Sequence, residues 1–283
     1  MVSILCNTLW MSLANCLHLF AAPATSRLAK LVDFDWTVED SYAAQGLCPY
    51  ETVAFGYSPF CQLFTPQEWR HFGYSIDVDF SGFSAFTSPV GRANGLGWQQ
   101  ELVARLRGQP LGYDSHSQIN ATLDSMPETF PLNQSLYFDF THDTNILSVL
   151  TALGLRQFAS PLPVEEYPGD HAFTVAHLTP FGARLDLEVI RTPKPLRADR
   201  AGYAEEGAET KYVHLVLNQR TIPLGASFPE CDVLRADGWC ELDTFLAVQD
   251  RMAGLAQFDW ACFGDWEEPA YGETTDGAPP ARR

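Results

Sequence analysis

The sequence of 283 residues is poor in positive charge, with 18 Lys and Arg against 35 Asp and Glu, a formal net charge of −17. Phosphate backbones and anionic membrane surfaces are bound by clustered Lys and Arg, so this composition argues against a nucleic-acid binder and a polybasic membrane-surface protein. The sequence also lacks an uninterrupted apolar run of about 18 residues, which a membrane-spanning helix needs. We therefore expect neither a nucleic-acid partner nor a membrane partner.

Several catalytic and cofactor signatures are also missing. The sequence contains no Gly-x-Ser-x-Gly and no phosphate-binding P-loop, and Gly95-Leu96-Gly97 lacks the third glycine of a dinucleotide fingerprint. None of the seven cysteines has Cys-x-x-Cys spacing, which argues against a zinc site. We expect no metal and no cofactor.

Apolar residues are plentiful at 46%, and 19 Phe, 10 Tyr and 7 Trp argue against disorder. A chain of this length can bury a sizeable core in one large domain or two small ones.

The ends of the chain, its sequons and its cysteines favour secretion. Residues 1–26 carry no charge and include the small-x-small site Ala22-Pro23-Ala24, which resembles a secretory leader, although the usual positive start is absent. The alternative is a start codon beside unrelated coding sequence. Asn120 and Asn133 begin glycosylation sequons. Two locally spaced cysteine pairs could close small disulfide loops, namely Cys48 with Cys61 and Cys231 with Cys240. We expect an extracellular location.

Periodicity predicts a mainly helical part over residues 27–130. Thr65-Pro66-Gln67-Glu68 has the pattern of a helix start with a capping box. Residues 96–106 have apolar positions at helical spacing, and Gly108 then ends that helix.

The pattern changes to mixed strand and helix over residues 131–263. The pattern of residues 135–140 (SLYFDF) predicts a short strand. A helix is predicted to follow over 145–153 and to end at Gly154. Residues 184–191 and 212–218 alternate as half-buried strands, and 242–255 reads as an amphipathic helix. Residues 264–283 read as an acidic, flexible tail.

His142 and Asp143 lie at the predicted strand-to-helix junction, where α/β folds place ligands. The N-terminus of a helix attracts anions, and a histidine there can hold a phosphate oxygen. A carboxyl beside a bound dianion is protonated more readily and can then protonate a leaving alcohol. The structural alternative is that Asp143 only caps the helix and His142 is an interior histidine. A glycosidase pair within Asp33, Asp35, Glu39 and Asp40 is a further alternative, although a solvated charge cluster at a helix start also explains these residues.

Four stretches, in order, resemble histidine acid phosphatases of the fungal phytase type. Residues 136–155 (LYFDFTHDTNILSVLTALGL) resemble the second active-site motif of that family, and the other three stretches are 48–69, 95–106 and 212–224 with the later cysteines. The resemblance implies an α/β, phosphoglycerate-mutase-like fold with a helical subdomain. It assigns phosphate contact to His142 and proton donation to Asp143.

The family's Arg-His-Gly-x-Arg-x-Pro motif, whose histidine takes the phosphoryl group, is absent; Arg70-His71-Phe72-Gly73 does not match it. Cys262 is left without a local partner. This fits a missing N-terminal part, because the resemblance implies that the equivalent family cysteine pairs with one further upstream. We therefore expect an acid phosphatase by descent, truncated at its N-terminus, with phosphomonoester substrates, phytate among the candidates. The alternative is a catalytically dead secreted relative, or a fragment that acts by binding. Because the missing part should supply strands, we expect the chain alone to expose a sheet edge and to fold poorly.

Overall fold

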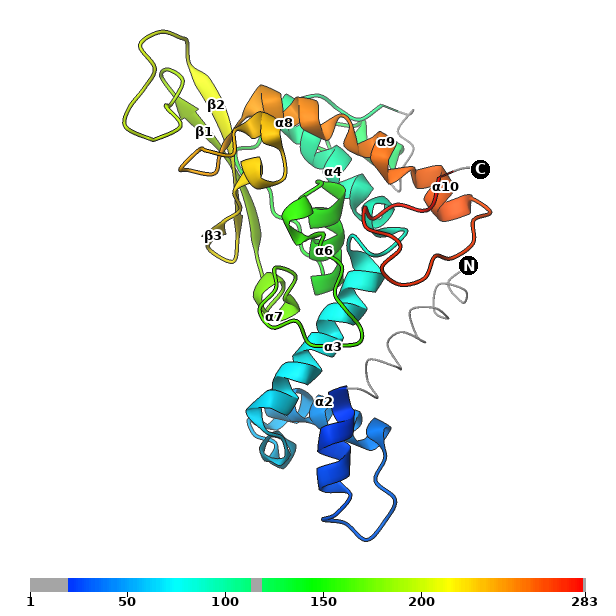
Figure 1. Cartoon of the computed structure of the whole chain (residues 1–283). Coiled ribbons are helices and arrows are strands. Elements are labelled where there is room, and N and C mark those ends of the chain that lie inside the picture. Colours follow the sequence, from blue (N-terminus) through cyan, green and yellow to red (C-terminus); the bar gives the residue numbers. More distant parts are fainter. Residues whose placement is uncertain (1–19, 113–118, 282–283) are drawn as a thin grey trace.

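The computed structural model describes residues 20–112 and 119–281, and it combines a set of helices with one small antiparallel sheet (Figure 1). Residues 20–28 are helical. The α-helices that follow are α2 (Val38–Phe55), α3 (Pro66–Ser84), α4 (Gly91–Arg107), α5 (Ala121–Asp124), α6 (Asp143–Ala152), α7 (Val175–Leu178), α8 (Leu242–Gln249), α9 (Met252–Ala256) and α10 (Phe258–Phe263). The 3₁₀-helices are η1 (Pro59–Leu63), η2 (Arg156–Phe158), η3 (Leu224–Ala226) and η4 (Pro229–Cys231). The strands are β1 (Leu185–Thr192), β2 (Thr210–Leu217), β3 (Arg220–Thr221) and β4 (Cys240–Glu241).

Local sequence signals set the ends of the two long helices α3 and α4. The Thr65 side chain accepts the Glu68 N–H, and the Glu68 side chain accepts the Thr65 N–H, so the predicted capping box is present. Helix α4 ends at Gly108, which has φ 64° in the left-handed region. Both predicted helices are confirmed, with α4 starting five residues earlier than the apolar pattern indicated.

The sheet is built around β2, which pairs antiparallel with β1, β3 and β4. A two-residue turn joins β2 to β3, and both turn residues, Asn218 and Gln219, have positive φ, as a hairpin turn that matches strand twist requires. The Asn218 side chain also donates to the Leu178 carbonyl and accepts the Arg184 N–H, which fixes this end of the sheet. The predicted strands over 184–191 and 212–218 are confirmed within two residues.

Two local predictions were wrong. Residues 135–140 are not a strand, because no neighbouring strand pairs with them in the described chain. The helix predicted over 242–255 is divided into α8 and α9 at Asp250 and Arg251, where the Arg251 N–H bonds to the Val248 carbonyl, three residues back instead of four.

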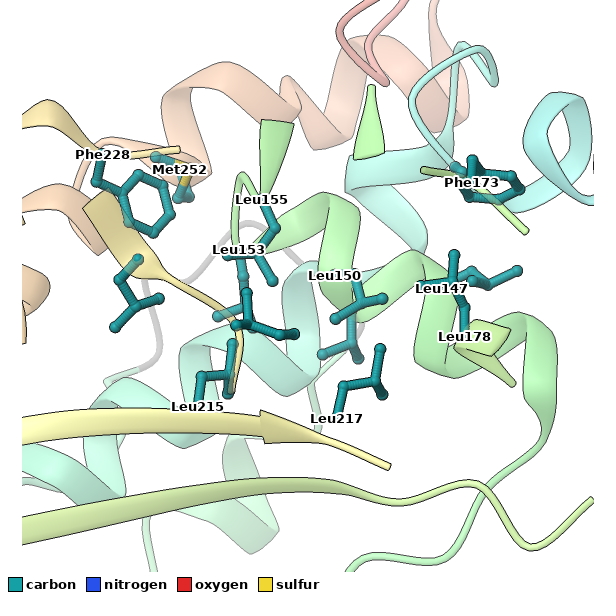
Figure 2. Close-up of a cluster of buried hydrophobic side chains, with 14 of the residues drawn as sticks. Leu147, Leu150, Leu153, Leu155, Phe173, Leu178, Leu215, Leu217, Phe228 and Met252 are labelled. Carbon is teal, nitrogen blue, oxygen red and sulfur yellow. The ribbon is translucent and has the colours of Figure 1, made fainter. Parts of the chain in front are cut away.

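The main core lies between helix α6 and the sheet. Figure 2 shows Leu147, Leu150 and Leu153 of this region facing Leu215 and Leu217 of β2. Each of these five side chains is at most 5% exposed, and burying one leucine contributes about 1.5–3 kcal/mol. A second, smaller cluster joins Ala24 and Leu28 to Ala44 and Phe64. It lies at the N-terminal end of α3, where α2 packs (Figure 1).

The segment after α10 contacts α4 and the first residue of η2. The buried Arg92 donates to both the backbone carbonyl and the carboxylate of Asp276, and Arg156 pairs with the same carboxylate. The Gly277 carbonyl accepts the Arg92 N–H, and the Gly277 N–H donates to the Phe86 carbonyl. Composition gave no sign of these contacts, since the partners lie far apart in the sequence. Among the described helices, none combines the length and the apolar character needed to span a membrane.

Candidate functional site

Helix α6 is held in place by an unusually close approach to α4. A Cβ added at Gly95 of α4 would lie 2.2 Å from the backbone oxygen of Ser148 in α6, so only glycine allows this spacing. The Ser148 hydroxyl donates to the Ser84 carbonyl at the end of α3. The C-terminal half of α6 is therefore rigidly fixed in the core, which gives its N-terminus a defined position.

His142 and Asp143 lie at that N-terminus and are exposed to solvent. His142 is the N-cap residue in an extended conformation, and its side chain makes no capping hydrogen bond. The Asp143 carboxylate accepts the Thr144 N–H at 2.7 Å. The structural alternative for His142, an interior histidine, does not fit this exposed position.

This arrangement can bind an anion. The first N–H groups of a helix have no partner within the helix, and its dipole favours negative charge there. His142, as the N-cap residue, brings an imidazole to this end of the helix. Within residues 20–112 and 119–281, no arginine or lysine forms an ion pair with Asp143.

Asp139 is a neighbouring residue that sequence reasoning missed. Its carboxylate accepts from Arg105 at 2.7 Å and from the Trp98 indole N–H at 2.9 Å, both on α4. The Arg105 guanidinium also lies over the Tyr137 ring, 5.1 Å from its centre. These contacts tie the segment that leads into His142 to α4. The only sequence signal for these contacts was the spacing of Tyr137 and Asp139. Residues two positions apart in an extended chain have their side chains on the same side.

A half-buried carboxyl group, that of Glu101, lies on the same face of α4. Burial raises the pKa of Glu101, with repulsion from Asp124 and Asp139 adding to the effect and Arg105 opposing it. Burial also raises the pKa of Asp124. The surroundings of Asp139 therefore hold more acid groups than the single guanidinium of Arg105 neutralises.

The two predicted disulfides are present. Cys48 bonds to Cys61 and Cys231 bonds to Cys240. Cys262 forms no disulfide within the described residues, while Cys6 and Cys16 lie outside them. The sequon residues Asn120 and Asn133 are both exposed, and their glycosylation stays a prediction.

Of the carboxylates weighed as a glycosidase pair, Glu39 and Asp40 lie in the first turn of α2, and Asp33 and Asp35 precede that helix. Asp40 completes a capping box with Thr37, which gives it a structural role. In the described part of the chain, no group of three or more His, Cys, Asp or Glu side chains is placed to hold a metal ion.

Comparison with known proteins identifies the family. The model of the histidine phosphatase superfamily (branch 2) matches residues 7–218, a match that begins inside the segment predicted as a leader. Phytase A of Aspergillus terreus is 34% identical over 246 residues, which are 83% of this chain and 48% of that protein. Phytase A of Aspergillus awamori is 35% identical over 224 residues, covering 76% of this chain and 43% of that protein.

The fold agrees with this result. A crystal structure of the phytase from D. castellii matches with a TM-score of 0.57 at 21% identity, over 92% of this chain and 46% of that one. The predicted fold class, α/β with a helical part and of the histidine-phosphatase type, is confirmed. The chain spans about half the length of the relatives it matches. From the family model that covers most of its length and the fold that it shares with a phytase, the chain belongs to the histidine phosphatase superfamily, branch 2.

Proposed function

We propose that this chain supplies the phosphate-contacting and proton-donating residues of an acid phosphatase that hydrolyses phosphomonoesters outside the cell. His142 holds a phosphate oxygen, and Asp143 protonates the oxygen of the leaving alcohol. The observation that carries the proposal is the exposed His142-Asp143 pair at the N-terminus of α6, in a chain of this family. Relatives named Phytase A make phytate a substrate to test first.

The geometry suits this division of roles. A phosphate at the start of α6 meets the first backbone N–H groups of the helix, of which that of Thr144 already donates to Asp143, and the N-cap residue His142. Asp143 is the first residue of the helix, and its exposed carboxylate already accepts a backbone N–H there. General acid catalysis by a positioned carboxyl group contributes about 10²–10⁴-fold in rate when the leaving group is a poor one.

The phosphoryl-accepting histidine is proposed to lie outside this chain, because the sequence has no Arg-His-Gly-x-Arg-x-Pro motif. We therefore expect the purified chain alone to hydrolyse neither phytate nor an aryl phosphate. Turnover by the chain alone, retained after removal of contaminating phosphatase, would contradict this part of the proposal.

The proton-donor role is tested with Asp143→Asn in a fusion of this chain to the half of A. terreus Phytase A that it does not match. We expect alkyl phosphate turnover to fall by about 10²-fold or more, and p-nitrophenyl phosphate turnover to fall much less, because its leaving group needs no proton. Asp199→Asn, in an exposed loop, is the matched control and should leave both rates unchanged. Equal losses on the two substrates would show that Asp143 is not the proton donor. If the fusion binds phosphate without turnover, the chain is a binding relative instead.

A further inference from the structure

A buried carboxyl group and a histidine hold the loop before α7 against α3. The side chains of Asp77 and His171 are 5% and 13% exposed. One Asp77 oxygen accepts the Val175 N–H at 2.6 Å, and the other lies 3.0 Å from Nε2 of His171. On the other side of the ring, Nδ1 of His171 lies 2.8 Å from the Gly169 carbonyl oxygen. The imidazole therefore stands between two oxygen atoms, both at hydrogen-bond distance.

These contacts fix the number of protons that the pair must hold. A carbonyl oxygen only accepts hydrogen bonds, so Nδ1 of His171 carries a proton. Nε2 then either carries a second proton and donates to an ionised Asp77, or accepts a proton from a neutral Asp77. In both arrangements the two side chains share one proton between them. When that proton leaves, His171 has a single N–H for two acceptors, so one of the two contacts sets lone pair against lone pair.

Other titratable groups surround the pair. His177 of α7 is exposed and acts on the Asp77 carboxylate through its charge. Asp79 follows two positions later in α3, about 200° around the helix, and burial raises its pKa as it does that of Asp77. The rest are neighbouring rings and exposed acids, namely Tyr74, Tyr167, His71, Glu165, Glu166 and Asp170. His177 and Asp79 are therefore the groups whose titration has to be separated from that of the pair.

The segment held by this pair also supports α6. Figure 2 shows Phe173 of the loop and Leu178 of α7 together with Leu147 of α6 in the main core. Leu147 lies in the first half of the helix whose N-terminus presents His142 and Asp143. Because protein interiors are close-packed, loosening of the loop and α7 removes support from this half of α6.

We propose that Asp77 and His171 form a proton-dependent latch, which holds residues 169–178 against α3 in acid and releases them as the pH rises to neutral. The shared proton leaves to solvent water, and the contact that it bridged opens. The latch itself is independent of catalysis. Only its consequence rests on the proposed function: the support of His142 and Asp143 is firmest in acid, where an acid phosphatase works.

The test follows amide hydrogen exchange of the full chain by NMR from about pH 5 to about pH 8, the range in which histidine commonly changes its charge. Each rate is compared with that of an unfolded peptide at the same pH, because exchange itself quickens as the pH rises. We expect the protection of the Val175 amide to fall by about 10-fold or more, as for the loss of a hydrogen bond to a charged group. The paired amides of β2 should change much less.

Asp77→Asn separates the shared proton from the packing of the loop. Its amide oxygen can accept the Val175 N–H while its amide N–H donates to a neutral His171, so this variant needs no shared proton. The protection of Val175 in it should not fall as the pH rises. Asp79→Asn and His177→Gln are the matched controls, and both should keep the fall of the original chain.

The same measurements are made on the fusion to the unmatched half of A. terreus Phytase A, so that two formats of the folded chain are compared. Constant protection of Val175 over this range overturns the latch, as does a fall of equal size in Asp77→Asn or in β2. Loss of the fall in either control assigns the pH dependence to another group and also overturns it. The absence of protection in acid in both formats does the same. None of these measurements involves turnover, so the latch stands or fails separately from the proposed function.

Discussion

Asp77 of α3 is the clearest buried acid outside the candidate site, being only 4% exposed. One of its oxygens accepts the Val175 N–H at the start of α7, and the other lies 3.0 Å from the His171 ring. The second ring nitrogen of His171 is 2.8 Å from the Gly169 carbonyl. These contacts fasten the loop before α7 to α3. Burial raises the pKa of Asp77, although the Val175 N–H and the nearby His171 and His177 oppose the shift.

A raised pKa means that the folded chain binds this proton more tightly than the unfolded chain does. The contribution of Asp77 to stability is therefore fully present below its ordinary pKa and is lost as the pH rises through the raised value. We expect the stability advantage of the original chain over Asp77→Asn to shrink between mildly acidic and neutral pH. Urea unfolding of both proteins across that range measures it. An advantage that grows as the pH rises would contradict the assignment.

Among the elements, the helices were predictable because their signals are local. The capping residues of α3 and the glycine that ends α4 are read directly from the sequence. Residues 135–140 have the composition of a strand. A strand forms only where another strand pairs with it, and composition does not show whether such a partner is present. The ion pair between Arg92 and Asp276 joins residues 184 positions apart, which no local pattern reveals. His142 and Asp143 were predicted as site residues from a strand-to-helix junction and a family motif, both of which are local in sequence. Asp139, in contrast, contacts α4 residues that lie 34 and 41 positions away.

The contact between α4 and α6 makes a prediction at the scale of these elements. Gly95→Ala places a methyl group 2.2 Å from the Ser148 backbone oxygen, so the helices must separate. We expect a loss of about 1–3 kcal/mol or more in the free energy of unfolding, as for overpacking in a core. Gly46→Ala in α2 is the control, because nothing lies within 4 Å of its added methyl group. That variant should gain roughly 0.5–1 kcal/mol from helix propensity. Equal effects of the two substitutions would show that the close approach does not limit stability.

The whole molecule carries a net charge of −17, and most of its acid groups are at the surface. Compaction brings these charges together, so repulsion opposes folding at neutral pH. Raising the ionic strength from roughly 0.01 M to roughly 0.15 M shortens the screening length from about 30 Å to about 8 Å. We expect the Tm to rise by a few degrees, at about 2–4 °C for each kcal/mol of repulsion removed.

The Tm should rise equally in NaCl and KCl, since screening depends on ion charge alone. A Tm that falls with salt would mean that surface ion pairs, such as Arg107 with Asp250, outweigh the general repulsion.

The two disulfides have a consequence for covalent connectivity. They join residues only 13 and 9 positions apart, one pair beside α2 and the other beside β4. Within the described chain, neither crosses from the helical part to the sheet. A single protease cut in the segment between α6 and β1 therefore leaves two polypeptides that stay together only through packing. On a denaturing gel run without reductant, such a nicked molecule should migrate as two separate bands, whereas under native conditions it should still elute as one.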